Sequence, residues 1–407
     1  STTTLVSNDN TGRDVIVTFH PDTNLVVALT KSGTTNYAQA ITIASSGSSI
    51  TQGSAVNMSL GHEAAWSNAV YDEDSGYIVA AYQYNSRPYL VAYKPSGSGS
   101  SATVTVGSSS QVYTDTVQNI DLYYDKSQNK IVVGYSDNNV SDNYFLHPVS
   151  VNSSTGALTV GTRQNVTSEA TGFGGLIYDE NAGRGIWSGY FAGSINDYIS
   201  MFAIKLNDDD SFTIGTKIDD TSFNDSFNSQ AATTTKGGNR AYPMIYHPVL
   251  KKSIFLYRTQ TNSYLGAWAV TCTDTTLTVG TKSDLATTAY GRASLGFSYD
   301  SDTNYIVIPS RRTTGGTEML MQAYRPAYSE TNLTATNFIG LASAAISDTA
   351  TGDINVKGGI NEAQSSLTIG SDYYVQTDGT LGTTADTPSV KVGKAISATT
   401  INMMDLT

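Results

Sequence analysis

This chain of 407 residues has few cysteines and histidines, the residues that form disulfides and bind zinc. It contains one cysteine and four histidines. One cysteine excludes an internal disulfide framework, and we expect Cys272 to pack inside a strand as a small apolar residue. The histidines show no HxH or HxxxH spacing, and no CxxC occurs. The sequence therefore predicts no metal site and no cofactor.

Positive charge and long apolar runs are also scarce. The chain has 23 basic and 35 acidic residues, and its basic residues cluster no further than isolated pairs such as Arg311-Arg312. Nucleic-acid binding needs clustered Lys and Arg, so we expect no nucleic-acid partner. No apolar stretch approaches the ~18 residues of a membrane-spanning helix. We therefore expect no membrane insertion. No signal peptide precedes Ser1, unless the numbered chain is a trimmed product, and a fold without disulfides fits cytoplasmic synthesis with no secretion step.

What the sequence does have is a repeat. An aromatic residue followed by Asp or His, then a polar turn, then an apolar run, recurs at intervals of 52, 53, 54, 68 and 53 residues, by subtraction of positions. Chains built from small antiparallel sheets show such spacing of short strands and turns. The six anchors are Phe19-His20, Tyr71-Asp72, Tyr124-Asp125, Tyr178-Asp179, Tyr246-His247 and Tyr299-Asp300.

Each repeat has room for four strands. In the third repeat we expect strands at 120–124, 130–135, about 144–151 and 157–162, the last ending in a Val-Gly motif that recurs in other repeats. A four-stranded sheet of this size cannot bury both faces alone, and radial stacking solves that problem. The sequence therefore predicts an all-β, six-bladed β-propeller over residues 1–328, with the N-terminal strand Thr2–Val6 closing the last blade.

The anchor stops after Arg325-Pro326. Short apolar segments at 337–342, 353–356, 373–376 and 390–393 predict a small β-rich module over 334–407, with a helical turn near 342–346. We expect this module to anchor the chain or to join copies of it.

These residues resemble a known family. The segments 121–125 and 129–135 resemble Tyr-Asp repeats in virion structural and fibre-like proteins of marine tailed bacteriophages, and the tail segments 335–340 and 373–381 resemble a small module that ends many such proteins. The resemblance implies a particle component that displays a propeller outside the capsid or tail, and it implies no known catalysis. The chain departs from the family pattern at His20, His147 and His247 and in its 68-residue interval.

Three arginines form the sharpest candidate site. Arg13, Arg240 and Arg292 lie 6, 6 and 7 residues before their anchors, in blades that a closed ring makes neighbours. Together they predict a binding site for a carboxylate at one mouth of the channel. The alternative is that they pair with nearby acids, and Arg292 is out of register by one residue.

The long fourth interval carries an insertion with Phe223 and Phe227, a second candidate binding element because long loops on a rigid scaffold often bind ligands. The alternative is that both rings pack on the fourth blade. We expect His20 and His247 to serve as hydrogen-bonding turn residues, and the Asp turns to be Asx turns rather than calcium loops.

The sequence predicts a structural component of a bacteriophage particle, either a tail fibre or a capsid decoration (head fibre), that contacts host-surface glycans. The expected partners are other virion proteins, further copies of the chain and host glycans. We expect synthesis in the host cytoplasm and assembly on the exterior of the virion. No paired carboxylates recur in register, so we expect no enzyme. The alternatives are a sialidase-like, glycan-active propeller enzyme and a bacterial surface adhesin.

Overall fold

A computed structural model describes most of the chain and divides it into two compact units, Ser1–Arg325 (unit 1) and Pro326–Thr407 (unit 2). The sequence predicts a propeller that ends at residue 328 and a C-terminal module that begins at residue 334. The residues that the structure describes are 16–32, 35–43, 49–61, 64–167, 171–191, 199–220, 244–258, 265–281, 283–286, 298–301, 303–311, 319–324, 338–347, 350–376, 380–385 and 389–403.

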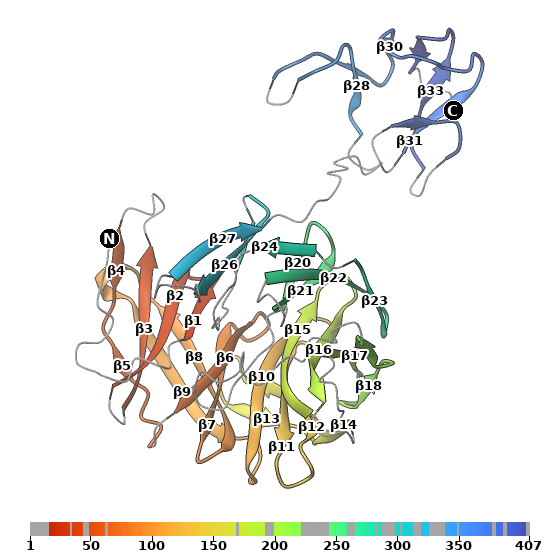
Figure 1. Ribbon diagram of the computed structural model, residues 1–407. Coiled ribbons are helices and arrows are strands. Elements are labelled where there is room, and N and C mark those ends of the chain that lie inside the picture. Colours follow the sequence, from red (N-terminus) through yellow and green to blue (C-terminus); the bar gives the residue numbers. More distant parts are fainter. Residues whose placement is uncertain are drawn as a thin grey trace. The chain divides into compact units, whose positions relative to one another are not determined.

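The described part of unit 1 contains six antiparallel sheets, named here sheet one to sheet six in chain order (Figure 1). Sheet one has β1 (Ile16–His20), β2 (Leu25–Ser32), β3 (Thr35–Ile43), β4 (Ile50–Gln52) and β5 (Val56–Asn57). Sheet two has β6 (Ala65–Asp72), β7 (Tyr77–Tyr84), β8 (Arg87–Ser96) and β9 (Thr103–Gln111), with a 3-10 turn η1 (Gly99–Ser101). Sheet three has β10 (Val117–Asp125), β11 (Lys130–Asp137), β12 (Asn143–Val151), β13 (Leu158–Val160) and β14 (Gln164–Thr167).

The remaining sheets of unit 1 follow the same plan. Sheet four has β15 (Thr171–Asp179), β16 (Arg184–Phe191), β17 (Ile199–Leu206), β18 (Phe212–Ile214) and β19 (Ile218–Asp220). Sheet five has β20 (Met244–His247), β21 (Lys252–Arg258), β22 (Leu265–Thr273), β23 (Thr276–Val279) and β24 (Ser283–Ala286). Sheet six has β25 (Ser298–Asp300), β26 (Tyr305–Arg311) and β27 (Met319–Tyr324).

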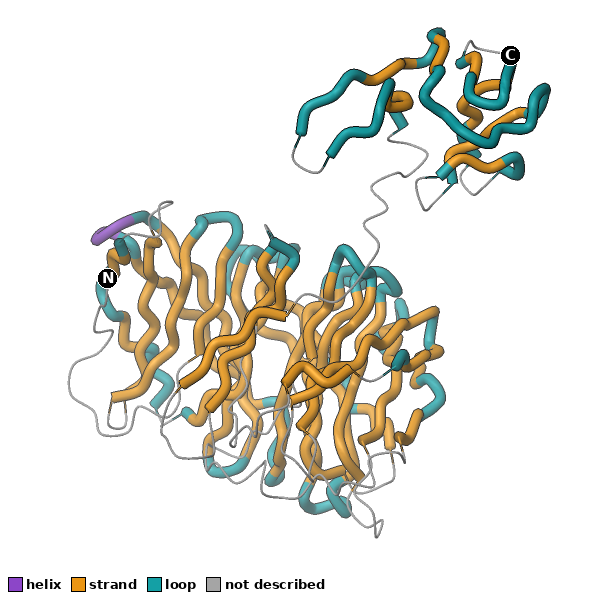
Figure 2. Tube along the Cα trace, turned by 45° about the horizontal axis from the view of Figure 1, so that its top comes forward, coloured by secondary structure: helices purple, strands orange, loops and turns teal. Residues whose placement is uncertain are grey.

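The first strand of each sheet contacts the first strand of the next. β1 contacts β6, β6 contacts β10, β10 contacts β15, β15 contacts β20, and β20 contacts β25. The sheets therefore stand side by side and meet through their first strands, and the tube in Figure 2 shows the neighbouring sheets. This is the radial stacking of a β-propeller, and it confirms the all-β class expected from the sequence.

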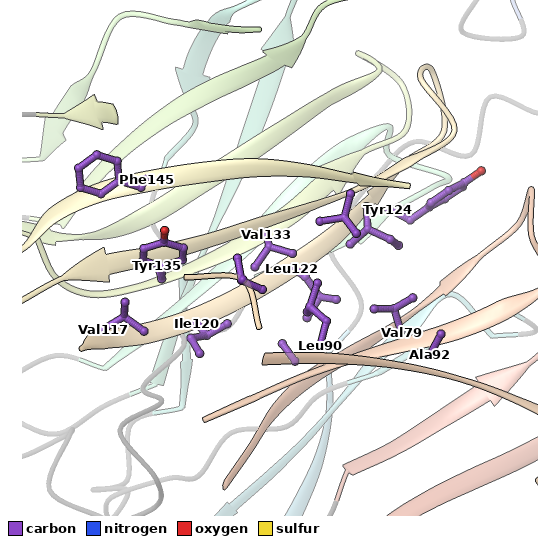
Figure 3. Packing of buried hydrophobic residues seen from close by; sticks show 14 of the residues in the cluster. Val79, Leu90, Ala92, Val117, Ile120, Leu122, Tyr124, Val133, Tyr135 and Phe145 are labelled. Carbon is purple, nitrogen blue, oxygen red and sulfur yellow. The ribbon is translucent and has the colours of Figure 1, made fainter. Parts of the chain in front are cut away.

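Sheet two buries both of its faces because sheets one and three cover them. On β7, Ile78, Ala80 and Tyr82 join the apolar cluster shared with sheet one. The alternate residues Val79 and Ala81 join the cluster shared with sheet three, which Figure 3 shows. A period-two strand covered on both sides has a continuous apolar run, and β7 is buried over most of its length.

The anchor turns join the first and second strands in all six sheets, as predicted. The fourth residue after each anchor Asp or His has a positive φ, which Gly and Asn adopt at least cost. These residues and their φ angles are Asn24 (52°), Gly76 (69°), Asn129 (51°), Gly183 (65°), Lys251 (50°) and Asn304 (58°).

The predicted fourth strand is a single strand only in sheet two. In sheet three it is split into β13 and β14, which both pair with β12. The split falls at Gly161, whose N–H donates to Pro148 O at 2.8 Å. A Cβ at this position would collide with the Pro148 ring and lie 3.1 Å from Pro148 O. A Cβ at Gly107 or Gly280 would lie 3.2 Å from Ala92 O or Ala269 O, so crowding against a backbone carbonyl is the feature that these recurring glycines share.

Unit 2 is a second all-β body. Its strands are β28 (Gly340–Ala342), β29 (Ile354–Val356), β30 (Ile360–Asn361), β31 (Asp372–Val375), β32 (Leu381–Gly382), β33 (Lys391–Ala395) and β34 (Ile401–Asn402). β28 and β29 form a two-stranded ribbon, and the others form a sheet in the order β30-β34-β33-β31-β32. The helical turn expected near 342–346 is wrong, because Gly340–Ala342 pairs with β29 as a strand.

One small core holds unit 2 together. It contains Tyr373, Val375, Val392, Ile401 and Met403, all at most 6% exposed. No helix among the described residues has the length and hydrophobicity that crossing a lipid bilayer requires.

Candidate functional site

The five site residues predicted from the sequence, Arg13, Arg240, Arg292, Phe223 and Phe227, lie outside the described residues. The carboxylate site and the aromatic insertion therefore stay predictions. The candidate site described below is built from other side chains of unit 1.

The anchor histidines connect neighbouring sheets. A carbonyl oxygen only accepts hydrogen bonds, so Nε2 of His20 donates to Gly76 O, at 3.0 Å. Nε2 of His247 points in the same way at Asn304 O in sheet six, 3.4 Å away, while its Nδ1 accepts from Leu250 N at 3.3 Å. Burial lowers the pKa of His247. The turn role predicted for both histidines is confirmed.

The carboxylate oxygens of the anchor aspartates accept hydrogen bonds within their own turns and, at Asp179, from the neighbouring sheet. Asp72 Oδ1 accepts from the backbone N–H groups of Asp74 and Ser75 at 3.1 and 3.2 Å, which closes an Asx turn. Asp179 Oδ2 accepts from Ser253 Oγ of sheet five at 3.0 Å. Within the described ranges, no group of three or more His, Cys, Asp or Glu residues could hold a metal ion.

A row of charges crosses three sheets directly after the anchors. Lys126 Nζ lies 2.8 Å from Glu73 Oε1 and 3.0 Å from Glu180 Oε1. The three residues hold equivalent positions in sheets two, three and four, so the stacking brings them together. All three side chains are 40–51% exposed, which limits the energy of the row.

A buried carboxylate joins the same three sheets through their first strands. Asp121 on β10 accepts from Asn68 Nδ2 at 2.7 Å, from Leu122 N at 2.8 Å and, through Oδ2, from Leu176 N at 2.8 Å. Burial raises the pKa of Asp121 to about 6, although these three donors act in the opposite direction. The residue is tied to the framework, and we assign it a structural role.

An arginine held between two aromatic rings is the best candidate for ligand contact in the described part of unit 1. The Cζ atom of Arg163 lies 3.7 Å from the ring centroid of Phe145 and 4.1 Å from that of Tyr113. Its Nη1 donates to Asp137 Oδ2 at 2.8 Å, and Asp137 is fully buried. The guanidinium is therefore fixed by stacking and by an ion pair at once.

A second layer supports these rings. Tyr135 stacks on Tyr113 with centroids 5.8 Å apart, and its hydroxyl donates to His147 Nε2 at 2.8 Å. Nδ1 of His147 donates to Gly161 O at 2.9 Å. Burial, with the nearby charge of Arg163, lowers the pKa of His147, so the ring is neutral at pH 7.

The exposed parts of this cluster suit a sugar. Tyr113 is partly exposed, and the Arg163 side chain is 23% exposed. A flat aromatic ring packs on the apolar face of a pyranose, and a guanidinium donates to hydroxyl or carboxylate oxygens. The name "Arg163 cluster" is used below for Tyr113, Phe145 and Arg163 with their support from Asp137 and Tyr135.

The sequence analysis missed the Arg163 cluster, although a signal was present. Arg163 follows the glycine of the Val-Gly motif by two residues, as Lys217 follows Gly215 and Lys282 follows Gly280. A basic residue at a fixed place in three successive repeats is the pattern that marks a repeated surface position.

Comparison with known proteins finds only distant likenesses among solved structures. No family model and no curated protein matches the chain. It is similar to the solved structure of a mutant of AofleA from Arthrobotrys oligospora (10% identity, 77% of this chain and 83% of that one, TM-score 0.45). It is also similar to a putative 6-phosphogluconolactonase from Bacteroides uniformis (11%, 75% and 82%, TM-score 0.46) and to Trypanosoma rangeli sialidase (10%, 76% and 54%, TM-score 0.39).

The comparison corrects one expectation. The expectation of no enzyme, drawn from the lack of paired carboxylates in register, is contradicted, because a sialidase and a putative 6-phosphogluconolactonase are among the similar structures. Likeness at this level transfers no activity, substrate or residue role to this chain.

Proposed function

We propose that this chain is a structural component of a bacteriophage particle, a tail fibre or a capsid decoration, that presents unit 1 to host-surface glycans and is attached through unit 2. The observation that carries the proposal is the separation of the cores. Among the described residues, the apolar clusters of unit 1 contain only residues of unit 1, and the cluster of unit 2 contains only residues between 338 and 403. In a chain with two separately packed units, one unit can attach to a particle while the other binds a ligand.

The proposed fold is a closed ring of six blades, in which Thr2–Val6 supplies the missing fourth strand beside β27. The exposure of Phe19 on β1 supports closure of the ring. Phe19 is 52% exposed, whereas its counterpart Tyr124 is 7% exposed because sheet two covers it. Sheet six is the segment that closure brings against Phe19. Deletion of residues 1–8 is expected to lower the melting temperature of unit 1, and an unchanged melting temperature would contradict the closing strand.

Location on the particle is tested by imaging. Electron cryo-microscopy of intact particles, with an antibody fragment raised against unit 1, is expected to show labelled density outside the capsid or tail. Particles assembled with a chain that ends at residue 325 are expected to lack this density. Label inside the capsid, or incorporation without unit 2, would overturn the proposal.

Glycan contact is tested on the full chain. A panel of neutral and anionic glycans is expected to include binders whose affinity falls about tenfold or more with Tyr113→Ala or Arg163→Ala. Arg184→Ala is the matched control, since Arg184 is another partly buried arginine with an ion pair, to Asp274 Oδ1 at 2.6 Å. Sugar released from a bound glycan would identify turnover. Equal loss with all three variants would exclude the Arg163 cluster, and the same panel tests Arg13 and Arg240.

A further inference from the structure

Exposed apolar side chains are concentrated in unit 2. Of the twelve large apolar residues that are exposed in the described part of the chain, seven belong to unit 2, the smaller unit. They are Ile339, Ile346, Ile354, Val356, Ile360, Ile369 and Ile396. Two of them, Ile354 (44% exposed) and Val356 (60%), are neighbours on one face of β29.

The ribbon of β28 and β29 has two different faces. On the inner face, Leu341 packs against the core of unit 2, and Asn355 Oδ1 accepts from Asn361 Nδ2 at 2.8 Å. On the outer face, Ile354 and Val356 lie across from Ala342 and Gly340. These partners are small, so the two branched side chains stand exposed on this face of the ribbon.

The outer edge of β29 is suited to pairing with another strand. Ser343 N donates to Asp353 O at 2.9 Å, so the backbone groups of Asp353 and Asn355 point toward β28. The backbone groups of Ile354 and Val356 therefore point away from β28. Val356 O accepts from Gly359 N at 3.1 Å, and its second lone pair can still accept from a partner.

Two observations select the partner. A two-stranded ribbon is only marginally stable in water, and an open edge is a template for a further strand. In the described residues, β28 is the only strand that pairs with β29. The residues that flank β29 are Asp353 and Lys357, of opposite charge. Antiparallel pairing of β29 with an identical strand sets each charge opposite its complement.

We propose that β29 pairs antiparallel with β29 of a second copy of this chain, around a two-fold axis at Asn355. Ile354 then lies opposite Val356 of the partner, the outward backbone groups form ladder hydrogen bonds, and the apolar faces of both ribbons become continuous. This deepens the attachment role proposed above for unit 2, because it makes the attached species a dimer.

The first test is the oligomeric state of the full chain by light scattering, across about 1 to 100 µM protein. Wild type is expected to be a dimer at the upper end, and Ile354→Lys and Val356→Lys are expected to raise the dissociation constant about tenfold or more. Ile369→Lys is the matched control, since Ile369 is 67% exposed in unit 2 but lies on neither strand of the ribbon. A monomeric wild type, a trimer, or equal dissociation by the control overturns the proposal.

The second test fixes the register. Opposed residues of the proposed pair have Cα atoms about 5.5 Å apart, within disulfide range, whereas two copies of residue 354 are too distant to be bridged. An equimolar mixture of Ile354→Cys and Val356→Cys chains is expected to cross-link under mild oxidation, and each variant alone is not. The native Cys272 is buried and does not compete. Cross-linking of each variant alone, or none in the mixture, contradicts the register.

The two proposals fail separately. If the chain is monomeric but is found on the particle, the pairing of β29 is wrong and the attachment role stands. If it dimerises through β29 but is absent from the particle, the proposed function is wrong and the dimer stands.

Discussion

Unit 1 and unit 2 are both all-β, but they solve the problem of burying a sheet differently. Unit 1 stacks its sheets, so that residues of alternate parity on β7 pack on sheets one and three. Unit 2 has one small sheet and one ribbon, and it leaves seven large apolar side chains exposed. In a repeat, each sheet has its faces covered by the neighbouring sheets of the same chain. A single small sheet leaves apolar faces and strand edges that only another chain or element can cover.

The largest loss of stability is expected from a change at the interface of sheets three and four. Trp187 is fully buried, stacks on Phe202 with centroids 4.9 Å apart and contacts Tyr144. Trp187→Ala is expected to lower the free energy of unfolding of unit 1 by about 3–5 kcal/mol, because it removes a large side chain and leaves a cavity. Denaturant unfolding followed by circular dichroism measures the loss. Val249→Ala, at an exposed turn residue, is the control and should change little.

The corresponding change in unit 2 is Ile401→Ala. Ile401 is fully buried in the single core of that unit, and its truncation is expected to cost about 2–5 kcal/mol. The stability of so small a unit is low, so this loss should unfold unit 2 while the transition of unit 1 stays in place. Hydrogen exchange resolves the two units. Loss of protection in β10 of unit 1 would show that the two units are not independent.

The repeat explains why the fold of unit 1 could be predicted from the sequence and the details of unit 2 could not. Six anchors such as Tyr124-Asp125 repeat one local signal, and the strands of the third repeat begin and end within three residues of their predicted bounds up to Val151. The split at Gly161 was missed because it depends on Pro148 in the neighbouring strand. In unit 2, the segment at 342–346 has no repeat to compare with, and local helix propensity was misleading.

The candidate site was less predictable than the fold. The predicted Arg13, Arg240 and Arg292 were chosen by their distance from the anchors, and they lie outside the described residues. Arg163 was not chosen, because its partners Tyr113, Phe145 and Asp137 come from a connection and from two different strands. The basic residue two positions after the glycine recurs in three repeats, but its convergence with these partners depends on tertiary packing, which the repeat does not encode.

Polar groups also connect the stacked sheets of unit 1, and the pH dependence of stability tests this at Asp121. The pKa of Asp121 is about 6 in the folded chain and 3.8 in the reference state. An acid whose pKa is raised by folding favours the fold when protonated, so this stabilisation is present below pH 4 and lost as the pH rises through 6. The loss is about 2 kcal/mol between pH 4 and pH 7, because the carboxyl of the unfolded chain is already more than half ionised at pH 4.

Asp121→Asn removes this pH dependence. Relative to wild type, the variant is expected to gain about 2 kcal/mol in the free energy of unfolding between pH 4 and pH 7. Parallel pH profiles for the two proteins would show that the carboxyl titrates normally and that Asp121 is not enclosed by the three sheets. Asp208→Asn, at an exposed aspartate of the same unit, controls for the change in net charge.

The smallest expected effect concerns the exposed row of Glu73, Lys126 and Glu180. Lys126→Met keeps most of the apolar stem and removes the charge, which leaves the carboxylates of Glu73 and Glu180 without the cation that lies between them. Because all three side chains are 40–51% exposed, the expected loss in the free energy of unfolding is only about 0.5–1 kcal/mol. Lys391→Met in unit 2 is the matched control, since Lys391 Nζ makes one pair, 3.0 Å from Asp372 Oδ2. In about 1 M salt the Debye length falls to about 3 Å, so the Lys126 effect should shrink to the size of the control. An effect that survives high salt would mean that the lysine stem packs between the sheets, and stacking in unit 1 would then owe nothing measurable to these charges.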